Sequence, residues 1–363
     1  MKRIFSRLGP FPEHLFSILV VGVGCLVACE APSGGPAEEA TEASPAAPPV
    51  EWALAIHGGA GVTRAGVAAE TEPAYEKSLQ GALEEGKKIL QGDGTSLDAV
   101  EAVVRLLEDD PLFNAGRGAV FTNAGTNELD AAVMDGESLS CGAVSGLKTV
   151  KNPITLARHV MERSRHVFLV GDGAERFADE MAVDRVPADY FFVQRRHDRW
   201  RQVLEAEEEK TASSAAPPAL PTGQGRYGTV GAVALDRHGN LAAATSTGGM
   251  TNKRFGRVGD VPVIGAGTYA NNATCAVSCT GIGEQFIRHT VASDVSARME
   301  HGGRSLSEAA GEVIGEVLNP GDGGLIAVGK DGSISIEFNT EGMFHGSADS
   351  SGRFQVGIWA HGD

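Results

Sequence analysis

Two strands joined by a tight turn are predicted by the segment YGTVGAVALDRHGNLAAATSTGGMTNK, residues 227–253. Residues 229–235 are β-branched or small and apolar, which predicts a strand, and residues 241–246 predict a second strand. Between them, the sequence DRHGN at 236–240 carries the Gly and Asn that are typical of a tight turn. If the strands pair symmetrically about His238, the numbers of paired residues sum to 476, twice 238. Thr247 then lies opposite Thr229, close enough for the two side chains to meet.

Outward from this hairpin, strands and helices alternate along the chain. Apolar residues at helical spacing predict helices at 74–90 and 97–108, with Ser96 as the cap of the second. Further patterns predict strands at 52–56, 129–134, 141–148 and 166–170, helices at 153–163 and 172–181, and a second hairpin at 325–328 and 333–338. Long strands mixed with several helices indicate layers of both kinds.

Length and charge exclude several classes of protein. The chain has 363 residues, 42% of them hydrophobic, which is enough for one large domain with a sizeable core. Its net charge is 31 − 47 = −16, so we expect no nucleic-acid partner and no electrostatic docking on anionic lipid. Five cysteines are too few for a disulfide scaffold, and Cys141, Cys275 and Cys279 lack metal-ligand spacing. We interpret these three as buried thiols, or at most one disulfide.

The N-terminus has the features of a targeting segment. Basic residues precede an apolar run at 15–28 that is too short to span a bilayer comfortably, which predicts a signal peptide over residues 1–28. The run ends in LVAC, which resembles the lipobox of bacterial lipoproteins and implies acylation of Cys29. The alternative is an ordinary secretory signal in which Cys29 is incidental. Residues 29–50 are rich in Pro and Glu without aromatic residues, which predicts a disordered tether.

These features predict that the protein lies in the bacterial cell envelope, lipid-anchored and facing the periplasm. Glu30 stands where an Asp would mark retention at the inner membrane, which favours the outer membrane. The globular domain is expected over residues 51–363. Within it, residues 205–226 are charged and then rich in Ala, Pro and Gly, which predicts a flexible insertion.

Six motifs, in order, carry a resemblance to one family. They are IHGGAG at 56–61, LFNAGRG at 112–118, YGTVGAVALD at 227–236 continued by ATSTGGMTNK at 244–253, GRVGD at 256–260, SCTGIGE at 278–284 and FNTEGM at 338–343. The chain resembles the plant-type L-asparaginase / isoaspartyl peptidase family of N-terminal nucleophile hydrolases over about residues 52–345. The resemblance implies an α+β fold, a four-layer αββα sandwich with two antiparallel sheets between helix layers. It also implies self-cleavage between Gly228 and Thr229 into an α chain, residues 29–228, and a β chain, residues 229–363.

Cleavage would create the catalyst. A hydroxyl is a weak nucleophile and needs a base, and a chain-terminal Thr carries one in its own α-amino group, with a reference pKa of roughly 7.7–8.0. The family implies that Thr229 is the nucleophile, that Thr247 hydrogen-bonds and tunes it, and that the Thr280 hydroxyl and the Gly281 N–H stabilise the oxyanion. His57 is not needed as a base, and we interpret it as a structural histidine.

The expected substrates, L-asparagine and isoaspartyl dipeptides, present an α-carboxylate and an α-ammonium on one carbon. Arg257 can hold the carboxylate through two hydrogen bonds, and Asp260 can accept from the ammonium. By resemblance Gly283 completes the pocket, together with Thr280 and Gly281. The remaining residues carried over are structural, namely Asn114, Gly58 and Gly59. Residues matching a family loop that holds sodium through main-chain carbonyls are Leu107, Glu108, Asp110, Phe113, Ala115 and Arg117.

The resemblance implies no cofactor for catalysis, a structural sodium ion at most, and a homodimer of αβ units. Two alternatives stay open at this point. One is a glycosylasparaginase-like hydrolase, which shares Thr247 and the GRVGD motif. The other is a noncatalytic envelope lipoprotein that binds amino acids, which would explain the tether but not the Gly-Thr site. The chain after Met343 departs from the family pattern, which leaves the rim of the substrate site open.

Overall fold

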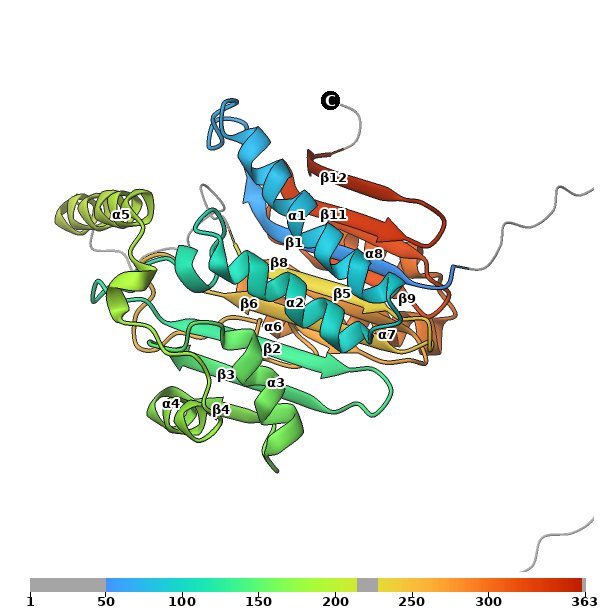
Figure 1. Ribbon diagram of the computed structural model, residues 1–363. Helices are drawn as coiled ribbons and strands as arrows, with labels where there is room; N and C mark the ends of the chain where they lie inside the picture. Colours follow the sequence, from blue (N-terminus) through green and yellow to red (C-terminus); the bar gives the residue numbers. More distant parts are fainter. Residues whose placement is uncertain (1–49, 214–227, 361–363) are drawn as a thin grey trace, which may run out of the picture. The chain divides into compact units, whose positions relative to one another are not determined.

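Two β-sheets form the centre of the computed structural model, which describes residues 50–213 and 228–360 and, for residues 210–213, the backbone alone (Figure 1). The larger sheet has the strand order β12-β11-β1-β5-β6-β2-β3-β4, and the smaller has the order β10-β9-β8-β7. The strands are β1 (Ala53–Val62), β2 (Leu129–Asp135), β3 (Cys141–Leu147), β4 (Phe168–Val170), β5 (Val230–Leu235), β6 (Leu241–Thr247), β7 (Thr268–Ala270), β8 (Cys275–Gly281), β9 (Gly323–Gly329), β10 (Ile334–Phe338), β11 (Gly342–Asp349) and β12 (Phe354–Trp359).

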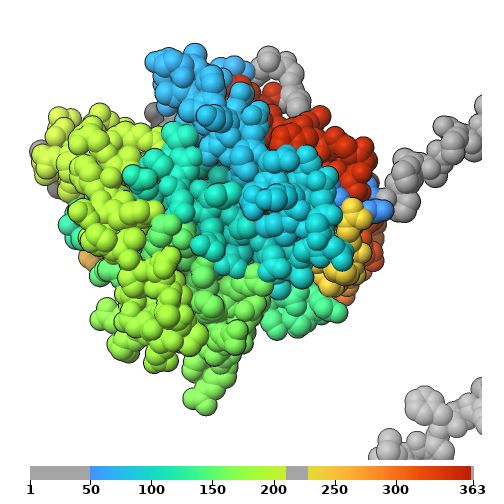
Figure 2. Space-filling model, in the orientation of Figure 1, coloured from blue at the N-terminus to red at the C-terminus, as the bar shows by residue number. Residues whose placement is uncertain are grey.

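Helices cover the outer face of each sheet. Helices α1, α2 and α3 pack on the larger sheet, and α7 and α8 pack on the smaller one. Figure 2 shows the atoms of α1 and α2 over the middle of one face, so the central strands lie beneath them. The predicted four-layer αββα sandwich is therefore confirmed. The helices are α1 (Glu72–Gln91), α2 (Ser96–Asp109), α3 (Pro153–Arg163), α4 (Gly171–Glu180), α5 (Gln194–Ser213), α6 (Gly283–His289), α7 (Val291–Gly302) and α8 (Leu306–Glu312), with short helical turns at Gly116–Gly118, Ala188–Phe191 and Val313–Val317.

The central strands are built from small residues because both of their faces are covered. In β5, Val230, Ala232 and Ala234 pack in the core beneath α1 and α2, whereas Val233 and Leu235 pack in the core between the two sheets. Every residue of β5 and β6 is buried. A strand covered on both faces has no polar face, so its sequence is a continuous apolar run rather than an alternating one.

The predicted register of the central hairpin is confirmed. Val230 pairs with Ser246 and Leu235 with Leu241, so each pair of numbers sums to 476. Continued by one residue, this register brings Thr229 opposite Thr247. On its other side Thr247 pairs with Asp130 of β2. The second predicted hairpin is also present, as β9 and β10.

Four local predictions were wrong. Strand β1 does not stop at Ile56 but continues through the glycines to Val62, with shifts in register after His57 and Ala60. Thr95 rather than Ser96 caps α2, because its side chain accepts the Asp98 N–H. Strand β4 runs parallel to β3, since helix α3 connects them as a crossover, so the larger sheet is not wholly antiparallel.

The fourth error is confined to the first nine residues of the predicted flexible insertion at 205–226. Residues 205–213 continue helix α5, because Glu, Ala and Lys are good helix formers even where nothing apolar is buried. Residues 214–226 lie outside the described residues, as do the predicted signal peptide, Cys29 and nearly all of the predicted tether.

Two further observations complete the fold. The described cysteines Cys141, Cys275 and Cys279 are free thiols, and Cys141 is only half-buried. Burial raises the pKa of the Cys275 thiol to about 12. In the part of the chain that the structure describes, no helix has the length and apolarity needed to cross a membrane.

Candidate active site

Thr229 lies directly before β5 and is 6% exposed. The preceding residue, Gly228, lies between two other segments of the chain. A Cβ on Gly59, where φ is +114°, would stand 2.7 Å from both the nitrogen and the oxygen of Gly228. A Cβ on Gly228 would stand 2.8 Å from Thr280 Oγ1. A side chain at Gly59 would therefore collide with the Gly228 backbone, and one at Gly228 would force the Thr280 hydroxyl to shift, so the bond between Gly228 and Thr229 lies between β1 and β8.

Thr247 ends β6, and the turn that follows it is held in place. Thr247 Oγ1 accepts the Gly249 N–H at 2.9 Å. Asn114, which is 1% exposed, donates from Nδ2 to the Gly249 oxygen at 2.8 Å and accepts the Val120 N–H at 3.0 Å. Asn114 thus joins the loop after α2 to the turn after Thr247.

Thr280 and Gly281 end β8 beside Gly228. Thr280 Oγ1 accepts the Ala60 N–H at 3.2 Å, so its own proton can be donated to another acceptor. Gly58, the other glycine predicted to be structural, packs against an aromatic ring, and a Cβ there would collide with Phe113.

Arg257, Asp260 and Gly283 come together in a second group. A Cβ on Gly283 would lie 2.9 Å from both Arg257 Nη2 and Asp260 Oδ1. Asp260 is 4% exposed, and its Oδ2 has no hydrogen-bond partner among the described residues. Burial raises the pKa of Asp260 to about 7, and the nearby Arg257 charge offsets only part of that rise. A buried carboxylate oxygen that lacks a donor is suited to receive a ligand ammonium.

Sequence reasoning missed the residue that orients Arg257. Glu284 accepts from Arg257 Nε at 2.9 Å and from Nη2 at 2.8 Å. Glu284 stands inside the SCTGIGE motif, but nothing in that motif identifies a partner 27 residues earlier. Residues 280–283 connect this group to Thr229 and Gly228, because Thr280 and Gly283 are three positions apart on one segment.

Two buried charges beside the turn were also missed. Asp130, opposite Thr247, accepts from Ser145 Oγ at 2.6 Å and from the Gly146 N–H at 2.9 Å. Lys253 is buried in the TNK motif and donates from Nζ to the Glu128 oxygen at 2.9 Å. Burial lowers the pKa of Lys253. The sequence feature that could have identified these two residues is a charge in an unusual place. Asp130 lies in an otherwise apolar strand, and Lys253 lies at the end of a Gly-rich stretch.

The segment that matches the sodium loop follows the C-terminus of α2. Gly116, with φ +46°, approaches the main-chain oxygen of Glu108 so closely that a Cβ would collide with it. Arg196 of α5 holds the same loop by donating to the oxygens of Gly118 and Leu112, at 2.9 and 3.2 Å. The carboxyl of Glu108 accepts from Ser246 Oγ at 2.6 Å, and burial raises its pKa to about 8. Main-chain oxygens at a helix C-terminus fit a hard monovalent cation.

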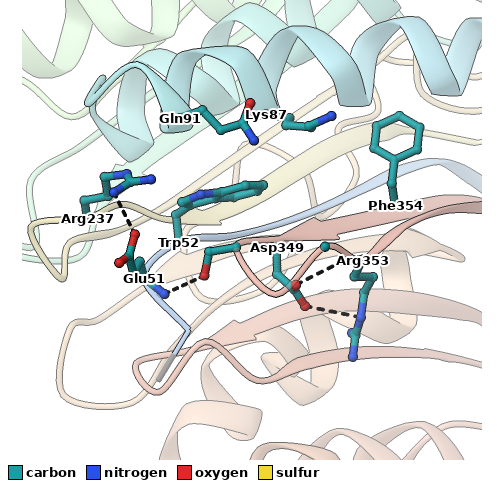
Figure 3. Close-up of a pocket in the computed structure, with 10 residues that line it drawn as sticks. Glu51, Trp52, Lys87, Gln91, Arg237, Asp349, Arg353 and Phe354 are labelled. Atoms are coloured by element: carbon teal, nitrogen blue, oxygen red, sulfur yellow. Dashed lines mark hydrogen bonds and ion pairs between the residues drawn. The ribbon is translucent and has the colours of Figure 1, made fainter. Parts of the chain in front are cut away.

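A separate pocket of about 430 Å³ lies at the N-terminal end of β1, whereas Gly59 and the candidate active site lie toward its C-terminal end (Figure 3). Four of its charged side chains form two ion pairs: Arg237 Nη1 lies 2.6 Å from Glu51 Oε2, and Arg353 Nε lies 3.3 Å from Asp349 Oδ2. Lys87, the fifth, pairs with Glu84, which does not line the pocket. None of the residues predicted for the active site lines this pocket.

Comparisons with known proteins agree with this geometry. Residues 50–358 match the protein family described as Asparaginase. The chain is 52% identical over 294 residues to an isoaspartyl peptidase of Salmonella typhimurium, covering 80% of this chain and 93% of that protein. It is 51% identical over 294 residues to an isoaspartyl peptidase of Escherichia coli, covering 80% and 91%. It is 42% identical over 312 residues to an isoaspartyl peptidase/L-asparaginase of Mus musculus, covering 85% and 91%.

Proposed function

Because the chain belongs to the asparaginase family, we propose that it is a self-processing amidohydrolase that releases L-aspartate from L-asparagine and from β-aspartyl (isoaspartyl) dipeptides. The observation that carries the proposal is the enclosure of Gly228. Gly59 and Thr280 confine the residue before Thr229, and residues 280–283 connect that site to Arg257 and Asp260.

Self-cleavage is the first reaction. Thr229 Oγ1 attacks the Gly228 carbonyl carbon, and the main-chain nitrogen of Thr229 leaves as an amine, which gives an ester between the two residues. Water hydrolyses that ester. The products are a carboxylate on Gly228 and a free α-amino group on Thr229, which is the base that the hydroxyl needs.

Substrate hydrolysis uses the same hydroxyl. The amine takes the proton of Thr229 Oγ1 as the oxygen attacks the side-chain carbonyl of the substrate, and Thr247 tunes the hydroxyl. The Thr280 hydroxyl and the Gly281 N–H donate to the oxyanion. Ammonia or a peptide amine leaves with a proton, and water then releases L-aspartate. Arg257 holds the α-carboxylate and Asp260 the α-ammonium.

Substitution of Thr229 by Ala tests the proposal. Wild-type protein is expected to migrate as two fragments on a denaturing gel, the smaller beginning at residue 229 by mass spectrometry. Thr229→Ala is expected to remain one chain without aspartate release. A wild-type preparation that hydrolyses β-aspartyl-leucine as a single uncut chain would overturn the mechanism.

The two alternatives are distinguished by substrate. A glycosylasparaginase-like enzyme would release aspartate faster from aspartylglucosamine than from β-aspartyl-leucine, and we expect the reverse order. A binding lipoprotein without activity would retain amino-acid binding in Thr229→Ala and would release no aspartate in the wild type.

We extend the proposal to a structural sodium ion, held by main-chain oxygens of Leu107, Glu108, Asp110, Phe113, Ala115 and Arg117. The ion would neutralise the negative end of the α2 dipole and stiffen the loop that carries Asn114. A higher melting temperature in sodium chloride than in choline chloride at equal ionic strength is expected. Equal melting temperatures would argue against the ion.

We also propose that the mature protein begins at an acylated Cys29, which anchors it in the outer membrane. The tether of residues 29–50 then connects this anchor to a globular domain in the periplasm. We propose a homodimer of αβ units as the assembly. Intact-mass measurement is expected to give a lipid-modified N-terminal fragment, and Cys29→Ala to leave the protein in the soluble envelope fraction. Light scattering of a preparation without the leader measures the assembly.

A further inference from the structure

A chain of buried polar side chains leads through the core between the two sheets to Thr229. It consists of His57 on β1, Ser278 on β8, Thr245 on β6 and Thr268 on β7, and each of these residues is 0% exposed. The other buried residues of that core are apolar, such as Ala55, Ala243 and Ile326, so polar side chains there need hydrogen-bond partners.

The four side chains alternate between the sheets and are all within hydrogen-bond distance of the next. His57 Nε2 lies 2.9 Å from Ser278 Oγ, and Ser278 Oγ lies 2.8 Å from Thr245 Oγ1. Thr268 Oγ1 donates to Thr245 Oγ1 at 2.7 Å. At the other end, His57 Nδ1 lies 3.1 Å from the main-chain oxygen of Thr229.

The donors can be assigned from the last contact. The carbonyl oxygen of Thr229 can only accept, so Nδ1 of His57 carries the proton. Burial lowers the pKa of His57 to about 3, which keeps the ring neutral, so Nε2 is an acceptor and Ser278 is its donor. Ser278 then accepts from Thr245, which in turn accepts from Thr268. The four hydrogen bonds that join these side chains to one another and to Thr229 all point toward Thr229, an arrangement in which successive bonds polarise one another. The Thr268 and Thr245 hydroxyls also lie 3.1 and 3.4 Å from the main-chain oxygens of Val261 and Gly267, so their protons are shared with those acceptors.

Gly231 makes room for this arrangement. It is paired with His57 across β1 and β5, and a Cβ on it would collide with Ser278 Oγ and with His57 Nε2. The third residue of the Thr-Val-Gly sequence is thus a glycine because the imidazole and the serine hydroxyl occupy the space where a side chain would be.

We propose that His57 is a positioning residue for Thr229: its Nδ1–H holds the Thr229 carbonyl, and Ser278, backed by Thr245 and Thr268, holds the imidazole in the tautomer that can do so. The inference rests on the proposed function of Thr229 as nucleophile and goes beyond it.

Thr229 needs this hydrogen bond once the bond to Gly228 is cut. The β5 ladder begins at Val230, so Thr229 lies outside it, and after the cut Gly228 no longer restrains its other side. A chain end restrained on one side alone tends to fray. The carbonyl, the amine and the hydroxyl of Thr229 are all attached within two bonds of one Cα, so a hydrogen bond that fixes the carbonyl also fixes the nucleophile and its base. Misplacement of reacting atoms by about 1 Å can cost about a hundredfold in rate.

Four variants test the proposal. His57→Leu removes the donor, and His57→Asn retains an N–H near the position of Nδ1. Ser278→Ala leaves the imidazole without the donor that fixes its tautomer. Ser296→Ala is the matched control, because Ser296 is 2% exposed and shares a 2.6 Å hydroxyl–hydroxyl hydrogen bond with Thr274, away from Thr229.

Steady-state kinetics on β-aspartyl-leucine, per mole of fragment beginning at residue 229, are the first readout. For His57→Leu and Ser278→Ala we expect kcat to fall about tenfold or more with little change in KM, since Arg257 and Asp260 are untouched. His57→Asn should recover at least about a third of the wild-type kcat, and Ser296→Ala should match the wild type in both constants. A folded His57→Leu that remains uncut while His57→Asn is cut also supports the proposal.

The second readout does not depend on activity. Imidazole ¹⁵N spectra of labelled protein should show His57 protonated at Nδ1 alone from pH 6 to 9, identified by the signals that His57→Asn loses. Ser278→Ala should shift that tautomer balance, and Ser296→Ala should not. This readout decides the matter if His57→Leu fails to fold.

The proposal is overturned if His57 carries its proton on Nε2, or if Ser278→Ala and Ser296→Ala lower kcat equally. An inactive, uncut wild-type protein with the expected ¹⁵N spectrum would instead refute the proposed function and leave the hydrogen-bond assignment standing.

Discussion

Glu284 holds the guanidinium of Arg257 by two hydrogen bonds, from Nε at 2.9 Å and from Nη2 at 2.8 Å. Arg257 also lies beside Gly283, where an added Cβ would stand 2.9 Å from Nη2. The arginine is therefore oriented before a substrate arrives, and binding need not immobilise a long flexible side chain.

The first prediction concerns this fork. Arg257→Lys retains the charge but loses the planar pair of donors, so we expect KM for β-aspartyl-leucine to rise about tenfold or more. Glu284→Gln retains one acceptor and should raise KM less. Initial-rate measurements over a range of substrate concentrations check both, and a wild-type KM in Arg257→Lys would show that the fork is not used.

The second prediction is a pH profile. Asp260 has its pKa raised to about 7, so it is neutral and cannot pair with an ammonium below that pH. The amine of a terminal Thr229, with a reference pKa of roughly 7.7–8.0, must also lose its proton. We expect the logarithm of kcat/KM to rise with pH from 5 to 7 with a slope above one. In Asp260→Asn, the slope should fall to about one, and activity should drop about a hundredfold. A slope of one in the wild type would show that Asp260 does not titrate with substrate binding between pH 5 and 7.

The third prediction concerns the glycine that faces the cleaved bond. Gly59→Ala places a Cβ 2.7 Å from the nitrogen and oxygen of Gly228, at a φ of +114°. We expect self-cleavage to slow about tenfold or more, because the scissile residue must move. Gly239→Ala is the control, since Gly239 has a φ of +82° but a Cβ there would meet nothing within 4 Å among the residues that the structure describes. The rate of fragment formation, followed on gels, distinguishes the contact with Gly228 from the backbone strain that both variants share. Equal slowing in both variants would contradict the prediction.

The fourth prediction concerns helix α5, which the sequence did not reveal. Arg196 is 7% exposed and donates to the oxygens of Gly118 and Leu112 in the loop that carries Asn114. Arg196→Ala should lower the free energy of unfolding by about 2–4 kcal/mol, because buried acceptors lose a charged donor. Exposed Arg199→Ala should change it by less than about 0.5 kcal/mol. Urea denaturation of both variants provides the measurement.

The sequence predicted correctly those elements whose structure depends on residues close to one another in the chain. The β5–β6 register follows from one short turn, so pairs such as Val230 with Ser246 could be predicted. Helix α3 was predicted with its observed bounds because Pro153 can begin a helix and the apolar spacing continues to its end. Helix α5 was not predicted at all, because its charged residues bury little and resemble a loop in composition.

The sequence by itself determined the strand pairs closed by short turns, and its ordered motifs determined the family. Contacts between side chains far apart in the sequence became visible in the folded structure. His57 and Ser278 are 221 positions apart and belong to different sheets. Their contact depends on how two layers stack, and that stacking is the sum of many weak apolar contacts that no single motif encodes.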